Sequence, residues 1–505
     1  MKHLKRNQLR AGVLLTYATI AANAVIQLVY TPVMLRLLGQ NEYGLYTLVG
    51  SVVSYLSLCS LGMTGSYLRF YARYKEEGNA NKIGSLNGCF LVLNILAALL
   101  AVILGVVMVQ KAELIFGSGL TQEELRKASI LMIILVANIA LTFPNSVFDS
   151  ILISEECFGY QRGLKLAAVV ANPFISLPLL LAGYDSIALV CVTTGLTLAS
   201  LAVNIYYCIR KLRVTISFRG IESDLVKRIG VFSFFIFLNM VIDQVNWNVD
   251  KLLLGRYWGT SVVAVYGVAS QLNALYNQCS SAVSSVFSPR INQLFAQNTE
   301  DNRKKINELF IQVGRIQFMI LMLLLGGIVF FGRYFIWVWA GEGYKDAYEV
   351  VLLLIIPSTI PLIQNLGIEI QRAQNKHHVR SVVYFAVMLL NITLSIPLSK
   401  AYGAIGAAAG TAVSMILGNG IFMNWYYQKC LDVNVTEFWR EILKLVPALI
   451  PSVLFGGYCM IGVEITDMRR FCILVLVYAI IYAASIWVYV QKKKGESRRR
   501  SDELR

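Results

Sequence analysis

Four polar side chains recur at regular spacing within an otherwise apolar stretch near the middle of the sequence. They are Asn239, Asp243, Asn246 and Asp250. The intervals of four, three and four residues place them on one face of a helix. A carboxylate in apolar surroundings needs a proton or a cation, and Asp243 lies near the middle of the stretch. The pattern favours ion coupling at Asp243 and Asp250, with H⁺ or Na⁺ as the ion and no other cofactor.

Polar residues at similar spacing occur in two further apolar stretches. One carries Thr16, Thr19, Asn23, Gln27 and Tyr30, and the other carries Tyr266, Ser270, Asn273, Asn277 and Ser281. Asn23 and Gln27 precede Asn239 and Asp243 by a constant 216 residues. Polar groups in hydrocarbon normally face a bundle interior or a wet cavity. The residues expected to line one shared cavity are Asn23, Gln27, Tyr30, Arg69, Asn239, Asn246, Trp247, Lys251, Asn273 and Asn277.

Each of these polar residues also has a purely structural interpretation. Ser, Thr and Asn side chains form hydrogen bonds between packed membrane helices. Asp250 is followed by Lys251, so an ion pair near the outer surface is the alternative to coupling. Arg69 and Glu369 lie near helix ends, where long side chains reach water.

Cysteine and histidine usage argues against metal chemistry and catalysis. The nine cysteines are scattered without a C-x-x-C pair, and the three histidines are His3, His377 and His378. A metal site needs clustered ligands, and none of these histidines lies inside an apolar stretch. We therefore expect no metal site, no catalytic residue and no enzymatic activity.

Composition identifies the class of protein that must position these residues. Of 505 residues, 57% are hydrophobic and 15% are charged, and the mean hydropathy is +0.61. Soluble domains carry about 25% charged residues, so a soluble enzyme and a disordered chain are both excluded. The net charge of +16 would suggest nucleic acid in a soluble protein. Because the basic residues lie mainly in short loops, we expect a helical membrane protein that does not bind nucleic acid.

Fourteen stretches are long and apolar enough to span a bilayer, which takes about 20 residues each. Their ranges are 11–37, 43–70, 83–109, 128–150, 163–182, 187–208, 229–255, 260–288, 312–340, 347–371, 381–399, 404–428, 441–462 and 471–490. The sequence thus predicts an all-α integral membrane protein with about fourteen transmembrane helices.

The distribution of Lys and Arg predicts the orientation of these helices. The termini and the loops after even-numbered helices, with adjoining helix ends, carry 33 of them, whereas the alternate loops carry 9. Positive residues accumulate on the cytoplasmic side, so both termini are expected in the cytoplasm. The basic tail at 492–505 is expected to contact anionic lipid.

The sequence also repeats itself weakly at a large offset. The pattern N-x-x-x-S-x-P occurs at 172–178 and again at 391–397, an offset of 219, and Pro144 pairs with Pro361 at 217. Six intervening helices give both copies the same orientation. We therefore expect parallel repeats about a central cavity: an N-lobe at 1–220 with helices one to six and a C-lobe at 221–435 with helices seven to twelve. The last two helices, at 436–491, precede the tail.

Six motifs in order resemble a known family. They are LLGQNEYGLY (Leu37–Tyr46), LGMTGSYLRF (Leu61–Phe70), DKLLLGRYWGTSVVAVY (Asp250–Tyr266), FSPRI (Phe287–Ile291), WAGEGY (Trp339–Tyr344) and AYGAIGAAAGTAVS (Ala401–Ser414). These motifs resemble those of the bacterial polysaccharide flippases in the multidrug/oligosaccharidyl-lipid/polysaccharide exporter superfamily. The resemblance covers helices one to twelve.

The resemblance implies a function and a location. Such a protein flips an undecaprenyl-diphosphate-linked oligosaccharide from the inner to the outer leaflet of the bacterial plasma membrane by alternating access, with ion coupling. Expected partners are the lipid-linked oligosaccharide, a polysaccharide polymerase and glycosyltransferases, and we expect a monomer. Related lipid-linked precursor flippases hold the pyrophosphate with cavity arginines. Helices one and eight lack internal arginines here, leaving Arg69, Lys251 and Arg333.

Two other functions remain open from the sequence. A drug or cation antiporter of the same fold would use acidic and aromatic cavity residues, as Asp243 and Trp247 provide. A membrane polymerase or transferase of the same pathway would need a large outer loop or embedded catalytic groups, which the sequence does not offer.

Overall fold

The computed structural model describes residues 2–218, 223–297, 300–374, 377–431 and 433–503, and the regular secondary structure in these ranges is helical. The helices up to the middle of the chain are α1 (Lys2–Leu38), α2 (Gln40–Val53), η1 (Ser54–Ser60), α3 (Met63–Glu76), α4 (Ala80–Gln110), α5 (Ala112–Phe116), η2 (Gly117–Gly119), α6 (Gln122–Ser154), α7 (Phe158–Leu181), α8 (Ser186–Tyr206), η3 (Tyr207–Lys211) and α9 (Ser223–Trp258). Those that follow are α10 (Thr260–Gln297), α11 (Glu300–Ala340), η4 (Glu342–Tyr344), α12 (Ala347–Ile363), α13 (Leu366–Ala373), α14 (His377–Met415), η5 (Ile416–Phe422), α15 (Met423–Cys430), α16 (Val435–Leu443), α17 (Val446–Gly462) and α18 (Met468–Glu503).

The predicted all-α membrane fold is confirmed. Within the described ranges, nine helices are long and apolar enough to cross a membrane, or eleven if α12 with α13 and α16 with α17 each form one bent span. α9 and α10, with 36 and 38 residues, carry two of the predicted polar faces and are not among these candidate spans. The count of fourteen stays a prediction.

The chain forms two compact units, Met1–Ala264 and Val265–Arg505. The predicted lobe boundary at 220–221 lies outside the described residues, as do the last two residues of the predicted tail, 504–505. α9 packs on α2 and α3 and therefore belongs to the first compact unit. The division into six-helix lobes stays a prediction.

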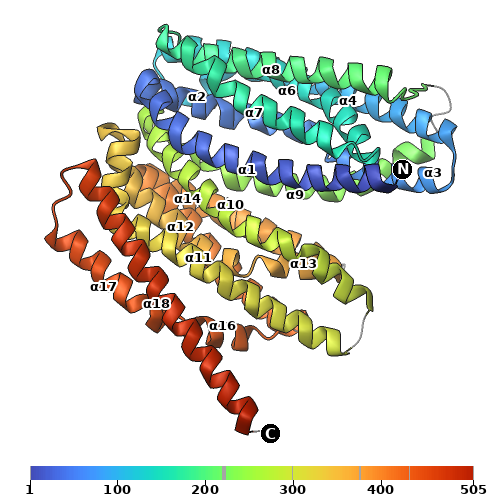
Figure 1. The fold of residues 1–505 in the computed structure, drawn as a ribbon. Helices are drawn as coiled ribbons and strands as arrows, with labels where there is room; N and C mark the ends of the chain where they lie inside the picture. Colours follow the sequence, from blue (N-terminus) through green and yellow to red (C-terminus); the bar gives the residue numbers. More distant parts are fainter. Residues whose placement is uncertain (1, 219–222, 298–299, 375–376, 432, 504–505) are drawn as a thin grey trace. The chain divides into compact units, whose positions relative to one another are not determined.

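In the first unit, long helices run side by side (Figure 1). α1 packs along α7, α4 along α6, and α6 along α8. α6 begins at a capping box in which Thr121 accepts from the Glu124 N–H and Glu124 reaches back to Thr121. Such a cap satisfies backbone donors that the helix leaves open, and it fixes where α6 starts.

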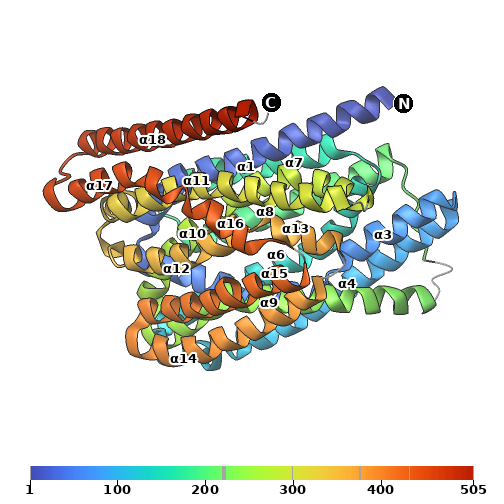
Figure 2. The same ribbon diagram turned by 90° about the horizontal axis from the view of Figure 1, so that it is seen from below.

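In the second unit, α11 is the common neighbour. It packs on α12, α16, α17 and α18, whose arrangement can be followed in Figure 2. Phe331, Cys459 and Tyr478 form a buried cluster where α11, α17 and α18 meet. α14 contains a sharp kink at Gly403, where φ is 58° and ψ is −135°. Only glycine adopts this conformation easily, and the kink separates the predicted helices at 381–399 and 404–428.

Helix α4 of the first unit has an apolar exposed surface and buried polar residues. Leu96, Leu99 and Ile103 are exposed, whereas Asn87 and Asn94 on the same helix are buried. An apolar exterior around a polar interior is what hydrocarbon requires. The chain is therefore a multi-pass membrane protein.

The two copies of the N-x-x-x-S-x-P pattern form similar hydrogen-bonded triads, which differ in the direction of the bond to threonine. In the first, Asn172 accepts from Ser176 (3.4 Å) and donates to Thr193 of α8 (3.3 Å). In the second, the Oδ1 atom of Asn391 accepts from Ser395 (2.9 Å) and from Thr411 (3.2 Å). An asparagine therefore joins a serine one turn later to a threonine of the following helical segment in both copies.

The triad predicts a specific loss of stability. Replacing Asn391 by Leu removes the shared acceptor, and we expect the free energy of unfolding to fall by about 1 kcal/mol, as for other hydrogen bonds between membrane helices. The measurement is thermal unfolding of the detergent-purified protein. Thr393→Val is the matched control, since Thr393 is exposed and its hydroxyl donates to Leu389 O of its own helix. Equal melting of the two variants would contradict a structural role for the triad.

Candidate functional site

The polar face of α9 divides into two parts. Asn239 and Asp243 are exposed, as is Trp247 at 49%. Asn246 and Lys251 are intermediate, and Asp250 is buried with 1% of its surface exposed. Residues 239, 243 and 247 follow one another at intervals of four, so they share a face. The structure thus brings Asn239, Asp243 and Trp247 together on an open surface and separates them from Asp250.

Gln244, which sequence analysis missed together with Asn248, fixes α9 against η1. Gln244 donates to Ser57 of η1 (3.1 Å) and accepts from Ser54 (3.1 Å) and from Asn248 (2.8 Å). Both Gln244 and Asn248 lie in the same apolar stretch as the predicted face. Their spacing of four was the available signal, and it marks the side of α9 that packs inside the first unit.

The predicted face of α1 is turned partly toward protein. Asn23, Gln27 and Tyr30 are half-buried, and α1 packs along α7. The Tyr30 hydroxyl lies beside Ser176 of α7. Thr16 bonds to Gly12 O of its own helix (2.8 Å). A cavity role for the α1 residues stays a prediction.

The polar residues of α10 are engaged in helix packing within the second unit. Asn273 is buried and accepts from Ser358 of α12 (3.3 Å), and Asn277 donates to Asn273. Tyr276 shares a hydrogen bond with Thr359 (2.8 Å). This arrangement matches the structural alternative for α10, so the cavity role of Asn273 and Asn277 stays a prediction. Arg69 lies exposed on α3 of the first unit.

A charged pair inside the first unit was also missed. Lys165 of α7 lies 3.2 Å from Asp149 of α6, and Asn204 of α8 donates to Asp149 (3.3 Å) and Asn145 (2.9 Å). Opposite charges in neighbouring apolar stretches were the signal for this site. Both residues lie at the ends of their predicted membrane spans, 128–150 and 163–182, where charged side chains can reach water.

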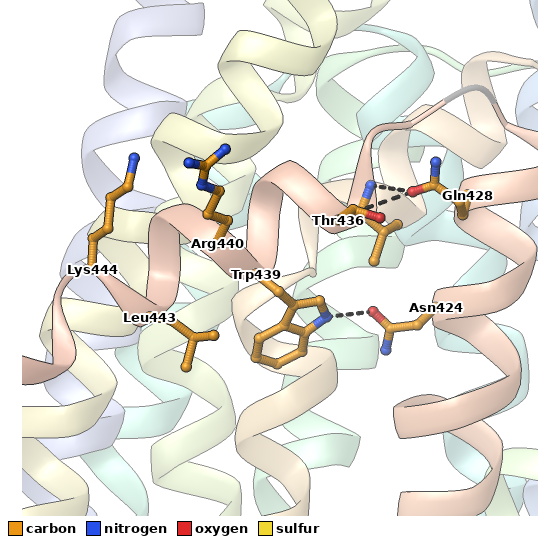
Figure 3. A pocket seen from close by; sticks show the side chains of 8 residues that line it. Asn424, Gln428, Thr436, Trp439, Arg440, Leu443 and Lys444 are labelled. Carbon is orange, nitrogen blue, oxygen red and sulfur yellow. Dashed lines mark hydrogen bonds between the residues drawn. The ribbon is translucent and has the colours of Figure 1, made fainter.

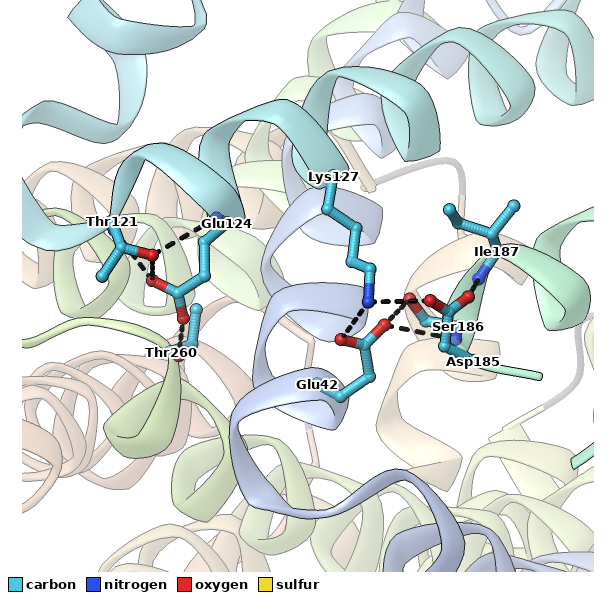
Figure 4. Close-up of polar contacts among 8 residues, drawn as sticks. All are labelled: Glu42, Thr121, Glu124, Lys127, Asp185, Ser186, Ile187 and Thr260. Atoms are coloured by element: carbon cyan, nitrogen blue, oxygen red, sulfur yellow. Dashed lines mark hydrogen bonds and ion pairs between the residues drawn. The ribbon is translucent and has the colours of Figure 1, made fainter. Parts of the chain in front are cut away.

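The ends of three helices in the first unit meet at one lysine (Figure 4). Lys127 of α6 lies 3.0 Å from Glu42 of α2 and 2.7 Å from Asp185, which caps α8. Glu42 also accepts from the hydroxyl and the backbone N–H of Ser186. We call Glu42, Lys127, Asp185 and Ser186 the Lys127 network.

The pKa of the Asp185 carboxyl reflects the charges of the Lys127 network. Burial alone raises the pKa of this carboxyl, but the Lys127 hydrogen bond, the Ile187 N–H and the Lys127 charge outweigh it and lower the pKa below its ordinary value. Asp185 therefore contributes stability at neutral pH. That contribution is lost only as acid carries the pH down through the lowered pKa, below about 4.

The turn between α9 and α10 docks beside the Lys127 network. Thr260 donates to Glu124 of α6 (2.7 Å), and Arg256 donates to Leu114 O (2.8 Å). A Cβ on Gly44 of α2 would lie 1.9 Å from Thr260 O, so only glycine allows this approach. The motifs at Leu37–Tyr46 and Asp250–Tyr266 thus lie against each other through Gly44 and Thr260.

A pocket of about 790 Å³ lies in the second unit beside α15 and α16 (Figure 3). The Trp439 indole donates to Asn424 (2.8 Å), and Gln428 accepts from the backbone of Val435 and Thr436. Among the described residues, no group of three or more His, Cys, Asp or Glu side chains could hold a metal ion.

Comparison with known proteins identifies the family. A model of the polysaccharide biosynthesis protein family matches residues 9–295, more than half of the chain. The chain belongs to this family. The family resemblance predicted from the six motifs is therefore confirmed.

The chain is also similar to a transporter relative and to two solved structures of other proteins. A putative O-antigen transporter of Shigella flexneri is 22% identical over 410 residues, which are 79% of this chain and 92% of that protein. The lipid II flippase MurJ, in an inward closed conformation, has a TM-score of 0.71 at 17% identity over 95% of this chain and 99% of that one. A multidrug resistance MATE family transporter of the MOP superfamily, inward-facing, has a TM-score of 0.60 at 12% identity over 84% and 99%. These two structures establish the fold.

The division of the α9 face predicts a labelling pattern. In a background without the exposed Cys191 and Cys472, cysteines at positions 239 and 243 should react with a membrane-impermeant thiol reagent. Cysteines at 242 and 250 should not, because Ile242 and Asp250 are buried. The rate of labelling in membrane vesicles is the measurement. Equal protection at all four positions would contradict an aqueous face.

The Lys127 network predicts a stability change in this polysaccharide biosynthesis protein. Lys127→Met leaves two carboxylates close together without their cation, and we expect a loss of about 1–3 kcal/mol in the free energy of unfolding at pH 7. Thermal unfolding measures the loss. In the double variant Lys127→Met with Glu42→Gln, part of the stability should return, because one of the two like charges is removed. No recovery in the double variant would contradict this charge balance.

Proposed function

We propose that this polysaccharide biosynthesis protein flips a lipid-linked oligosaccharide, carried on undecaprenyl diphosphate, from the cytoplasmic to the outer leaflet. The observation that carries the proposal is the exposed polar face of α9, with Asn239 and Asp243 on a helix of a family-matched membrane protein. A polar headgroup crossing a bilayer needs a polar surface, since hydrocarbon excludes it. The protein is a membrane transporter and not an enzyme.

Further features support the proposal. The Shigella flexneri relative is named as an O-antigen transporter, and the fold is shared with a lipid II flippase. The charge asymmetry of 33 against 9 supports cytoplasmic termini, and the family supports the bacterial inner membrane. A monomer that receives substrate from glycosyltransferases and delivers it to a polymerase accords with this role.

In the proposed cycle, Asn239 and Asn246 contact the sugar headgroup, and Lys251 and Arg69 are the cations available for the diphosphate. Asn23, Gln27, Tyr30, Asn273 and Asn277 line the cavity in other states of the cycle. The basic end of α18 contacts anionic lipid, next to the Lys493–Glu441 pair (2.6 Å) that joins α18 to α16.

Asp243 is the proposed coupling group, and Asp250 is the second candidate. A carboxylate that gains H⁺ or Na⁺ in one state and releases it in another shifts the balance between them by its differential affinity. Two multidrug MATE transporters share this fold at TM-scores of 0.60 and 0.55, and the proposed ion coupling is compatible with that fold.

A cation antiporter is the second candidate function, and one observation favours it. Trp247 is exposed one turn after Asp243, and an aromatic face beside a carboxylate suits an organic cation. Drug resistance conferred on a sensitive host, without restoration of surface polysaccharide, would favour the antiporter.

The coupling proposal predicts the effect of two substitutions. Asp243→Asn removes the titrating group, so it should abolish restoration of surface polysaccharide in a flippase-null strain while membrane levels of the protein remain normal. Asp243→Glu keeps a carboxylate and should restore part of it. Full complementation by Asp243→Asn would exclude this residue as the coupling group.

A further inference from the structure

A second cavity lies at one end of the second unit, apart from the faces of α9 and α10. It has a volume of about 670 Å³ and is formed by the end of α11, the η4 turn, the start of α12 and the end of α17. Its lining includes Arg333, Tyr334, Trp337, Asp346, Glu349 and Cys459. This volume lies within the range of small-molecule sites. We call it the α11–α17 groove.

One wall of the groove is aromatic and rigid. The rings of Tyr334 and Trp337 lie 5.6 Å apart at 53°, and Tyr334 is backed by Phe471 at 5.1 Å. Trp337 is 43% exposed, so its face is available to a ligand. Tyrosine and tryptophan offer large contact areas with little loss of side-chain freedom. The buried Cys459 and the half-buried Phe330 also line the groove.

The charged groups that line the groove compensate one another. Arg333 pairs with Glu349 (2.9 Å) and lies over the ring of Tyr348 at 5.5 Å. Lys345 pairs with Glu342 (2.6 Å). The fifth charged group, Asp346, is exposed, and its side chain has no hydrogen-bond or ion-pair partner among the residues that the structure describes.

The net charge of the side chains that line the groove indicates which ligand charge it can accept. Two cations face three carboxylates, and both cations already have carboxylate partners. A phosphate or an acidic headgroup would therefore meet net negative charge. A neutral ligand with many hydroxyls suits the groove, because hydroxyls donate to carboxylates and accept from Arg333 and Lys345.

We infer that the α11–α17 groove binds neutral sugar residues of the transported glycan. A pyranose ring places its C–H face on Trp337 and Tyr334 and directs its hydroxyls toward Asp346 and the Arg333–Glu349 pair. By the distribution of Lys and Arg, this end of the second unit faces the outside. The groove therefore retains the sugar after it has crossed. This inference rests on the proposed function and adds a glycan site outside the central cavity.

The test uses the full-length protein in nanodiscs of zwitterionic phosphatidylcholine. The probe is the neutral repeat-unit glycan released by mild acid from the lipid-linked precursors of the strain that carries the gene, with no lipid or diphosphate attached. Calorimetry or thermophoresis gives the dissociation constant. We expect Trp337→Leu to weaken binding about tenfold or more and Asp346→Asn to weaken it about threefold to tenfold.

Matched controls separate the groove from general effects. Trp425→Leu and Asp467→Asn change an exposed tryptophan and an exposed aspartate outside the groove, and both should bind the glycan as the unsubstituted protein does. Thermal unfolding confirms that each variant is folded.

The outcomes separate this inference from the proposed function. Absence of glycan binding, or binding that Trp337→Leu leaves intact, overturns the groove assignment. So does a groove that prefers phosphatidylglycerol over the glycan in a competition assay. Complementation of surface polysaccharide tests the flippase function independently, so either conclusion can fail while the other stands.

Discussion

A polar side chain inside hydrocarbon has to find its partners within the protein, and this requirement organises both units. The Asn172 and Asn391 triads each join neighbouring helical segments through one asparagine. Gln244 fixes α9 against η1 by the same means. With an apolar exterior, association between helices has no hydrophobic driving force. These buried hydrogen bonds therefore specify which faces meet.

The same requirement explains why two motifs of the sequence belong together. Gly44 gives the space for Thr260 O, and Glu124, two residues after the start of α6, accepts from the Thr260 hydroxyl. Glu42, from the same motif as Gly44, binds Lys127. The helix ends of the first unit are thus tied by charges at the surface, where water reduces the cost of ionised groups. Farther along the helices the ties are neutral amides and hydroxyls.

Much of this architecture follows from the sequence, because apolar length and polar spacing are local properties. Helix positions, the all-α class and the repeat of the N-x-x-x-S-x-P pattern could all be predicted. The partners of each polar group could not, because they depend on which helix packs opposite. Asn273 and Asp243 have the same signal in sequence, yet Asn273 is buried against Ser358 while Asp243 is exposed. Asp149 and Lys165 were missed for the same reason, since each becomes informative only beside the other.

One side of α9 is packed and neutral, and the other side is exposed and carries a carboxylate. Gln244 and Asn248 are neutral at every physiological pH, so their contacts hold the helix in place whether or not an ion is bound. Asp243 lies on the other side, where its charge can change without breaking those contacts. The free energy of ionising a carboxylate depends steeply on its access to water. In the proposed coupling, closing this face favours the protonated or ion-bound form of Asp243, and opening it favours release. If both sides of α9 were polar and packed, a change in charge on Asp243 would also break contacts that hold the helix. The free-energy cost of breaking those contacts would then oppose the binding or release of the ion.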